Sequence, residues 1–189
     1  MPEQPVIAFA SAGKFRQWLL KHHAVHPGIW MQIAKKDSGI ASIKYAEALD
    51  EALCFGWIDG QKKRHDETAW LQKFTQRGPR SGWSKINTGH VERLTREGRM
   101  QPAGQAAVDA AKADGRWARA YSSPRDAKVP ADFLTALSKH TKALAFFESL
   151  NKSNRYAIIY RLNDAKKPET RQRRLEQFVE RMKRGEKLH

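Results

Sequence analysis

Two strand-like segments joined by a short connection constrain the fold of this chain more than any other feature. The first, WIDGQKKRHD, begins at Trp57, and the second, AWLQKFTQR, begins at Ala69. The connection over residues 65–68 is short enough for an antiparallel hairpin. The apolar residues crowded in GIWMQIAKK, from Gly28, indicate a further strand. The N-terminal part of the chain therefore requires a small sheet, whose apolar face helices must cover.

Helical patterns flank these strands. Ser11 precedes apolar residues at i, i+3 and i+4 spacing, which predicts a helix. Ser42 is the predicted N-cap of a second helix, which Gly56 stops. Two more helices are predicted from Ser84 and from Pro102, since serine caps helices and proline fits their first turn.

Beyond Pro130 the apolar pattern is entirely helical, and Pro168 is placed to open the last helix. The residues over 122–128 have the composition of a linker. We therefore predict an α+β fold, with a small antiparallel sheet and flanking helices followed by a helical C-terminal module. The predicted domains are an α+β N-terminal domain over residues 1–121 and a helical C-terminal domain over residues 129–189.

Positive charge is the strongest signal in the composition. The chain carries a formal net charge of +15, and the segments over 61–99 and 166–189 contribute +6 and +5 of it. Such a field favours anions of any kind, including nucleic acid, lipid headgroups, phosphates and carboxylates. We expect an anionic small molecule or an acidic partner protein, and nucleic acid is the alternative partner.

Other residue types bound the chemistry. Cys54 is the only cysteine, so no disulfide can form within the chain, and a reducing cytoplasmic location is expected. It could be a nucleophile, although an apolar helix favours an unreactive core residue. His22 and His26 have the spacing of metal ligands, but nearby cysteine and acidic partners are missing, so no metal site is expected. We find no apolar run long enough for membrane insertion, no secretory signal, no catalytic motif and no cofactor motif.

The segment FTQRGPRSGWSKIN is the strongest candidate binding loop. A helix N-terminus offers free backbone N–H groups and a positive dipole end to an anion. Ser81 or Ser84 could cap this helix, and Trp83 could stack on a planar group. The candidate residues of the loop are Arg77, Arg80, Ser81, Trp83, Ser84 and Asn87. The alternative is a capped helix beside a solvated basic loop.

Two other positions, Asp59 and Arg171, carry alternative interpretations. Asp59 is either a turn residue or, if it shares a strand face with Trp57, a carboxylate directed into the same cleft. As an acid or base, Asp59 could support a small-molecule enzyme. Arg171 lies in line with the apolar stripe of the last helix, where a guanidinium requires an acidic or carbonyl partner within the protein, or a bound anion.

Four longer motifs carry a family resemblance: YAEALDEALCFGWIDGQ, FTQRGPRSGWSKIN, GRMQPAGQAAVDAAKADGRW and AKKPETRQRRL. With them, the chain resembles the bacteriocin-protection family, also called YdeI or OmpD-associated, from about Phe15 to Gly185. The residues over 129–185 resemble the helical C-terminal domain of that family. Where the family loop reads closer to FTPRR, this chain has Gln76 and Gly78, so one cation and one rigid proline are lost.

The resemblance implies a bacterial protein linked to resistance to bacteriocins or cationic antimicrobial peptides and to an outer-membrane porin. It supplies no catalytic residues. The positions that match the family pattern are Trp57, Asp59, Gly60, Arg77, Ser81, Trp83, Ser84, Asn87, Arg99, Trp117 and Arg171. We predict that an anion binds between the WIDG strand and the RSGWSKIN loop. Because the chain is cationic, it should repel cationic peptides, so simple sequestration of such peptides is not expected.

Overall fold

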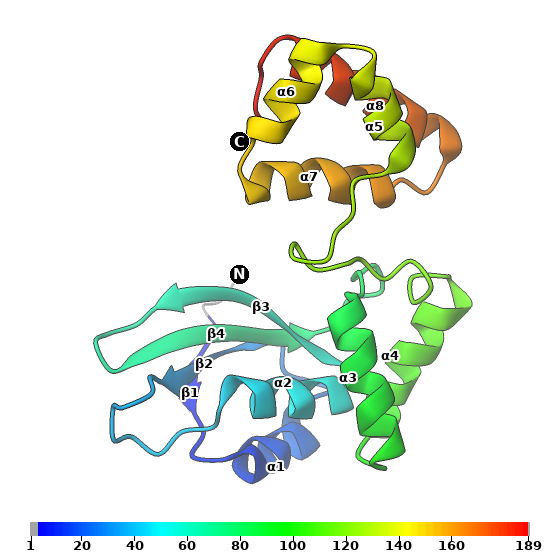
Figure 1. Ribbon diagram of the computed structural model, residues 1–189. Coiled ribbons are helices and arrows are strands. Elements are labelled where there is room, and N and C mark those ends of the chain that lie inside the picture. The colour runs from blue at the N-terminus through cyan, green and yellow to red at the C-terminus, as the bar shows by residue number, and fades with distance from the viewer. Residues whose placement is uncertain (1–3, 189) are drawn as a thin grey trace. The chain divides into compact units, whose positions relative to one another are not determined.

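The computed structural model describes residues 4–188 and divides the chain into two compact units (Figure 1). Unit 1 comprises Met1–Trp83 and Asn87–Ala118, and unit 2 comprises Ser84–Ile86 and Arg119–His189. Unit 1 contains the sheet and its helices, whereas unit 2 is helical. The predicted α+β class with a helical C-terminal part is therefore confirmed.

The sheet of unit 1 has four strands in the order β1-β2-β4-β3. The elements β3 (Trp57–Arg64) and β4 (Ala69–Gln76) form the predicted antiparallel hairpin. The central strand β2 (Ile29–Ala34) pairs antiparallel with β4. The short strand β1 (Val6–Ala8) was not predicted, and it pairs parallel with β2. The sheet is therefore mixed, not wholly antiparallel.

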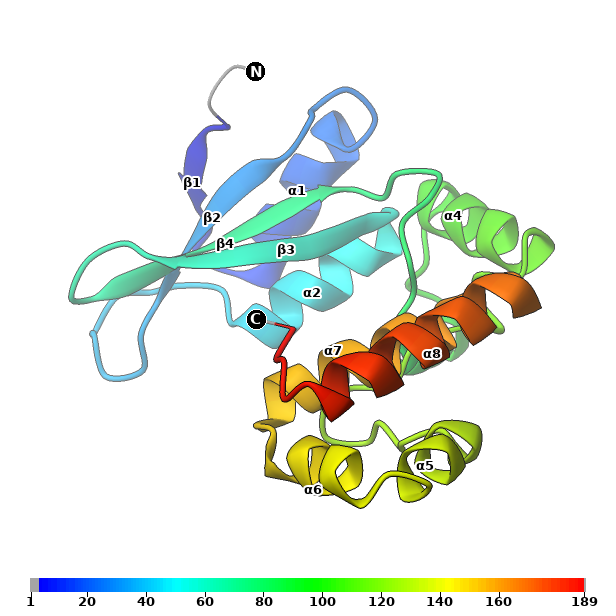
Figure 2. The same cartoon turned by 90° about the horizontal axis from the view of Figure 1, so that it is seen from above.

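Helices α1 (Ala12–His22) and α2 (Tyr45–Cys54) lie on one face of the sheet, which we call the covered face (Figures 1 and 2). The alternation of the strands fixes which side chains lie there. Ile29 and Met31 of β2 and Phe74 of β4 point to the covered face, and each is 0% exposed. The intervening residues, beginning with Trp30, point to the opposite face, which we call the open face.

Of the two serines predicted to cap α1 and α2, only the one at α1 does so. Ser11 caps α1, where its Oγ accepts a hydrogen bond from the Lys14 N–H. Ser42 does not cap α2, because its hydroxyl accepts from the Ala34 N–H of β2 instead. The N-cap of α2 is Lys44, whose own N–H donates to the Glu47 carboxylate at 3.1 Å. The predicted start of α2 is corrected accordingly.

The remaining helices of the N-terminal part are α3 (Lys85–Arg96) and α4 (Pro102–Ala113). The first turn of α4 lies directly against the end of α2, where the Gln101 N–H donates to the Cys54 carbonyl at 3.0 Å. Gly104 allows this approach, since a Cβ there would lie 2.9 Å from the Leu53 carbonyl oxygen. Gly56 ends α2 as predicted, with a φ of +73°.

Unit 2 contains α5 (Ala131–Ser138), α6 (Thr141–Ser149), α7 (Lys152–Asn163) and α8 (Pro168–Lys183). Each contributes apolar side chains to one core. That core comprises Phe133, Leu137, Ala143, Phe147, Leu150, Ile158, Leu162, Leu175, Phe178, Val179 and Met182. Within residues 4–188, no helix has the length and apolar character needed to cross a membrane.

Candidate functional site

Trp57 is a core residue of unit 1. Its side chain is 0% exposed, and its indole N–H donates to the His23 carbonyl at 3.0 Å. The ring of Trp18 packs against it edge-on, with the two centroids 5.6 Å apart. A ligand-stacking role requires an accessible ring, and this one is enclosed by the protein.

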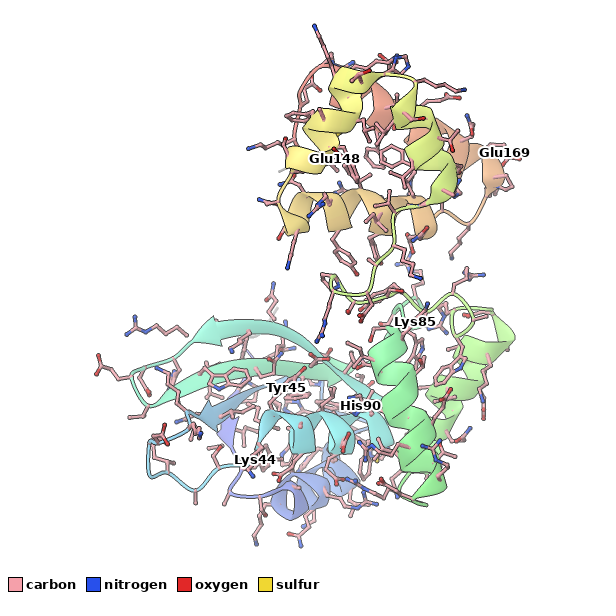
Figure 3. The ribbon with its side chains drawn as sticks, in the orientation of Figure 1. Lys44, Tyr45, Lys85, His90, Glu148 and Glu169 are labelled. Carbon is pink, nitrogen blue, oxygen red and sulfur yellow. The ribbon has the colours of Figure 1, made fainter. Side chains whose placement is uncertain are left out.

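Of the two interpretations of Asp59, the turn is wrong: Asp59 lies inside β3 and shares the covered face with Trp57. Its carboxylate accepts a hydrogen bond of 2.7 Å from the hydroxyl of Tyr45, the first residue of α2, which Figure 3 labels. Burial, followed by the hydrogen bond to Asp59, raises the pKa of Tyr45 above its usual range. Asp59 therefore joins the sheet edge to the start of α2.

The predicted binding loop is held together by its own aromatic and basic residues. Trp83 is 2% exposed, and the Arg77 guanidinium lies 3.5 Å from its ring centroid. The ring of Trp117 packs on Trp83, with the two centroids 4.9 Å apart. Arg77 also donates to the Gly82 carbonyl at 3.0 Å. The predicted stacking of a ligand on Trp83 requires an exposed ring, whereas this indole is covered within unit 1.

The other loop residues are placed as follows. Ser81 accepts from the Gly78 N–H at 3.0 Å and so closes the turn, while Arg80 is exposed. Ser84 forms an isolated bridge with Tyr121. Asn87 is half-buried in α3. Of the two arginines in the predicted binding loop, Arg77 is half-buried and Arg80 is exposed.

Arg99 belongs to an ionic network that joins α1, α2 and α3. The Glu51 side chain is 6% exposed and accepts from Arg99 at 2.7 Å and from Arg16 at 2.9 Å. The neighbouring Asp50 is bound by Arg93 at 2.7 Å and by His90, which Figure 3 labels, at 3.1 Å. The network supports a structural role for Arg99.

Arg171 forms a two-point ion pair with Asp132 at the start of α5. The guanidinium lowers the pKa of Asp132, mainly through this hydrogen bonding. Arg171 therefore has an acidic partner within the protein, Asp132, on a neighbouring helix of the same unit.

Cys54 is buried at the end of α2, and burial is the main cause that raises its pKa to about 11. Its thiol is therefore protonated at neutral pH, as expected of a core cysteine. His22 and His26 pack on the Trp18 ring at 4.9 and 5.2 Å. Among residues 4–188, no group of three or more His, Cys, Asp or Glu side chains is arranged to hold a metal ion.

Cations gather instead at the end of the sheet where β2 stops and the β3–β4 hairpin turns. They line a hollow of about 480 Å³, which we call the basic hollow. Its cationic residues, all exposed, are Lys35, Lys36, Lys62, Lys63 and Arg64, and its remaining lining residues are Ala34, Ala69 and Trp70. Ala34 and Ala69 are cross-strand partners, so two short side chains lie side by side at this end of the sheet.

Two contacts organise the basic hollow. Lys35 donates to the carbonyl oxygens of Asp66 and Glu67 at 3.1 and 2.8 Å, which ties the end of β2 to the hairpin turn. The Lys62 ammonium lies 4.1 Å from the ring centroid of Trp70. The carboxylate of Asp66 is occupied by the N–H groups of Thr68 and Ala69, each at 2.7 Å.

Unit 2 has a hollow of its own, of about 570 Å³, between the segment before α5 and the helix α7. Arg125, Lys152 and Arg155 line it together with Tyr156, whose hydroxyl donates to the Ser122 carbonyl at 3.0 Å. Each of the two units therefore carries a hollow lined by basic residues.

The residues predicted to bind a ligand lie in a different part of the sequence from the residues that line the basic hollow. The run Gln61–Arg64 was visible as a basic edge, and Lys35 and Lys36 directly follow the predicted strand. The missing information was strand order, because β4 lies between β2 and β3 and brings the two basic segments to one end of the sheet.

These features define a two-unit α+β protein with basic, open hollows. Residues 7–107 match the family model described as a domain of unknown function (DUF8412), and residues 126–185 match the model described as bacteriocin-protection, YdeI or OmpD-associated. The chain belongs to the DUF8412 family, whose model covers more than half of it, and residues 126–185 match the bacteriocin-protection, YdeI or OmpD-associated family, which is the family that the motifs resemble. Searches of curated proteins and of solved structures found no match.

Proposed function

We propose that this protein acts by binding an anionic ligand in the basic hollow. The observation that carries the proposal is the convergence of five exposed cations on one hollow whose lining residues include no acidic side chain. Like charges held this close repel one another, so a bound anion relieves a cost that the free protein bears. The ligand would be a phosphate or carboxylate group, which Lys and Arg donors recognise.

The basic hollow is a better candidate than the loop over 74–87. In the loop, Arg77 is half-buried, and its guanidinium already stacks on Trp83 and donates to the Gly82 carbonyl, so it is less accessible to a ligand than an exposed cation. In the hollow, only Lys35 donates to backbone carbonyls. Lys36, Lys63 and Arg64 are exposed residues. The Lys63 ammonium lies 4.2 Å from the Trp30 ring centroid, and because such a contact is weak at an exposed site, it can turn toward a ligand.

The family is associated by its description with bacteriocin protection. A net charge of +15 opposes the capture of a cationic peptide. We therefore propose that any protective role works through an anionic partner of this protein, and not through direct binding of the peptide.

The proposal is tested by titrating the full chain with sodium tripolyphosphate in a calorimeter at fixed ionic strength. The test variant combines Lys36→Gln, Lys63→Gln and Arg64→Gln. An exposed ion pair contributes up to about 1 kcal/mol, so loss of three should weaken binding by up to about 100-fold.

The matched control combines Lys14→Gln, Lys139→Gln and Lys142→Gln, three exposed lysines outside the basic hollow. It removes the same charge from the chain and should change the affinity about 2-fold or less, because these lysines do not line the basic hollow and exposed charges are screened by salt. Equal losses in the two triple variants would show that the binding is a general effect of net charge and would refute the site.

A further inference from the structure

We propose that the anion bound in the basic hollow is a single-stranded nucleic acid, and that its chain continues onto the open face of the sheet, where one base stacks on Trp30. This inference rests on the proposed function, because it names the class of ligand for the same site. It adds an aromatic contact that a simple anion does not need.

The strand register places the required groups together. Trp30 and Lys73 are cross-strand partners on β2 and β4, and they alternate with the buried Ile29 and Phe74. They therefore lie on the open face, opposite α1 and α2 (Figures 1 and 2). Lys63, which pairs with Leu71, lies on the same face and also lines the basic hollow.

Lysines cover an indole that is itself half-buried. The Lys63 ammonium lies 4.2 Å from the ring centroid of Trp30, and the Lys73 ammonium lies 5.7 Å from it. These cation–π contacts are weak at exposed sites, about 0.5–1 kcal/mol, so a nucleobase can displace them. The displaced ammonium groups remain beside the base, where the phosphates of a nucleic acid strand lie.

This combination favours a single strand over a duplex. A flat aromatic ring on a sheet face stacks with any exposed base, and the lysines around it follow the backbone. In a duplex, the bases are paired and stacked on each other, so Trp30 would gain no partner. Trp70, the indole that lines the basic hollow, lies on the covered face, where Tyr45 of α2 packs on it with the ring centroids 6.0 Å apart, so Trp30 is the stacking position of the open face.

The first measurement is the fluorescence anisotropy of 5′-labelled oligo(dT) of 15 nucleotides and of a duplex of the same length, at two salt concentrations. We expect the single strand to bind more tightly. If about six cations contact phosphate, the slope of log K against log salt should be near −4 for the single strand. The triple variant of Lys36, Lys63 and Arg64 should make that slope shallower by about 2.

The decisive variants change Trp30 alone. Trp30→Leu keeps apolar cover over the sheet but removes the π face, and it should weaken oligo(dT) binding by about 5-fold or more. Trp30→Phe keeps a stacking ring and should stay within about 2-fold of the parent chain. Circular dichroism of both variants checks that the sheet is intact.

A spectroscopic measurement covers the case in which Trp30→Leu does not fold. Stacking of a base quenches indole fluorescence, so oligo(dT) should quench the parent chain more strongly than Trp30→Phe. Equal quenching in the two proteins would overturn the stacking contact.

The two proposals fail in different ways. If tripolyphosphate binding depends on the basic hollow but oligo(dT) binding is unaffected by Trp30→Leu, the anion site stands and the nucleic-acid assignment is overturned. Tighter binding of the duplex, or equally tight binding of a 15-residue oligoglutamate, would also overturn it. If neither tripolyphosphate nor oligo(dT) depends on the three cations, both proposals fail.

Discussion

Replacing Gly104 with alanine should separate the ends of α2 and α4. A Cβ at Gly104 would lie 2.7 Å from the Cys54 carbonyl carbon and 2.9 Å from the Leu53 carbonyl oxygen. Real Cβ atoms essentially never approach other atoms closer than 3.0 Å, and both contacts are with backbone. The clash can be relieved only by moving one helix away from the other.

The magnitude follows from three contributions. Overpacking of this kind typically costs about 1–3 kcal/mol. Moving α4 also stretches the hydrogen bond from the Gln101 N–H to the Cys54 carbonyl, which is worth about 1 kcal/mol. Alanine returns at most about 1 kcal/mol through its higher helix propensity. We therefore expect Gly104→Ala to lower the free energy of unfolding of unit 1 by about 1–3 kcal/mol.

Gly89→Ala is the matched control, because Gly89 lies in α3 and an added Cβ there would meet nothing within 4 Å. That variant should be stabilised by about 0.5–1 kcal/mol. The same substitution thus has opposite signs at two helical positions of the chain.

The chain supplies its own reporter for this comparison. Cys54 is the only cysteine and is 0% exposed, so a thiol reagent modifies it only when unit 1 opens. Its rate of modification across a urea series gives the stability of unit 1 in the full chain. If Gly104→Ala left the urea midpoint unchanged, or raised it as Gly89→Ala should, the close approach of α2 and α4 would be refuted.

Two further predictions concern charged residues. Glu51→Gln should destabilise unit 1 by about 2–3 kcal/mol in the same Cys54 assay, because Arg16 and Arg99 lose their buried charged partner. The loss is not larger because both arginines are themselves partly exposed. A loss below about 0.5 kcal/mol would contradict this prediction. The pKa of Asp132 is lower in the folded chain, so its pair with Arg171 stabilises unit 2 above about pH 4 and this contribution is lost as the pH falls through the folded pKa. In Arg171→Gln the acid sensitivity of unit 2 should shrink, as measured by the NMR methyl signal of the buried Met182, and an unchanged acid transition would show that the pair contributes nothing.

Local chemistry made the main elements predictable. The hairpin followed from two strand-like segments with a short connection, and Pro102 and Pro168 each occupy the first turn of a helix as predicted. The start of α2 was not predictable, because the hydroxyl of Ser42 is engaged by β2, far from the helix. β1 was not predicted because a strand of three residues is too short to show an alternation of apolar and polar side chains.

The candidate site was harder to predict for a related reason. The sequence marked Trp83 as a stacking residue, but it is Trp117, distant in the chain, that packs on this ring. Lys36 and Lys63 could be recognised as basic, yet only the pairing of β2 with β4 and of β4 with β3 places them around one hollow. Residue types were therefore predictable, whereas their neighbours depended on tertiary structure.

The strand order also governs when the sheet can be completed during synthesis. The central strand β2 ends at Ala34, but its antiparallel neighbour β4 is finished only at Gln76. A hairpin closes within microseconds, whereas a pairing across a long intervening segment has a larger loop-closure cost. We therefore expect the β3–β4 hairpin to form as a unit before it docks on β2. That docking brings the cations of the hairpin against Lys35 and Lys36, so the last step of sheet assembly proceeds against electrostatic repulsion, and counter-ions accelerate it.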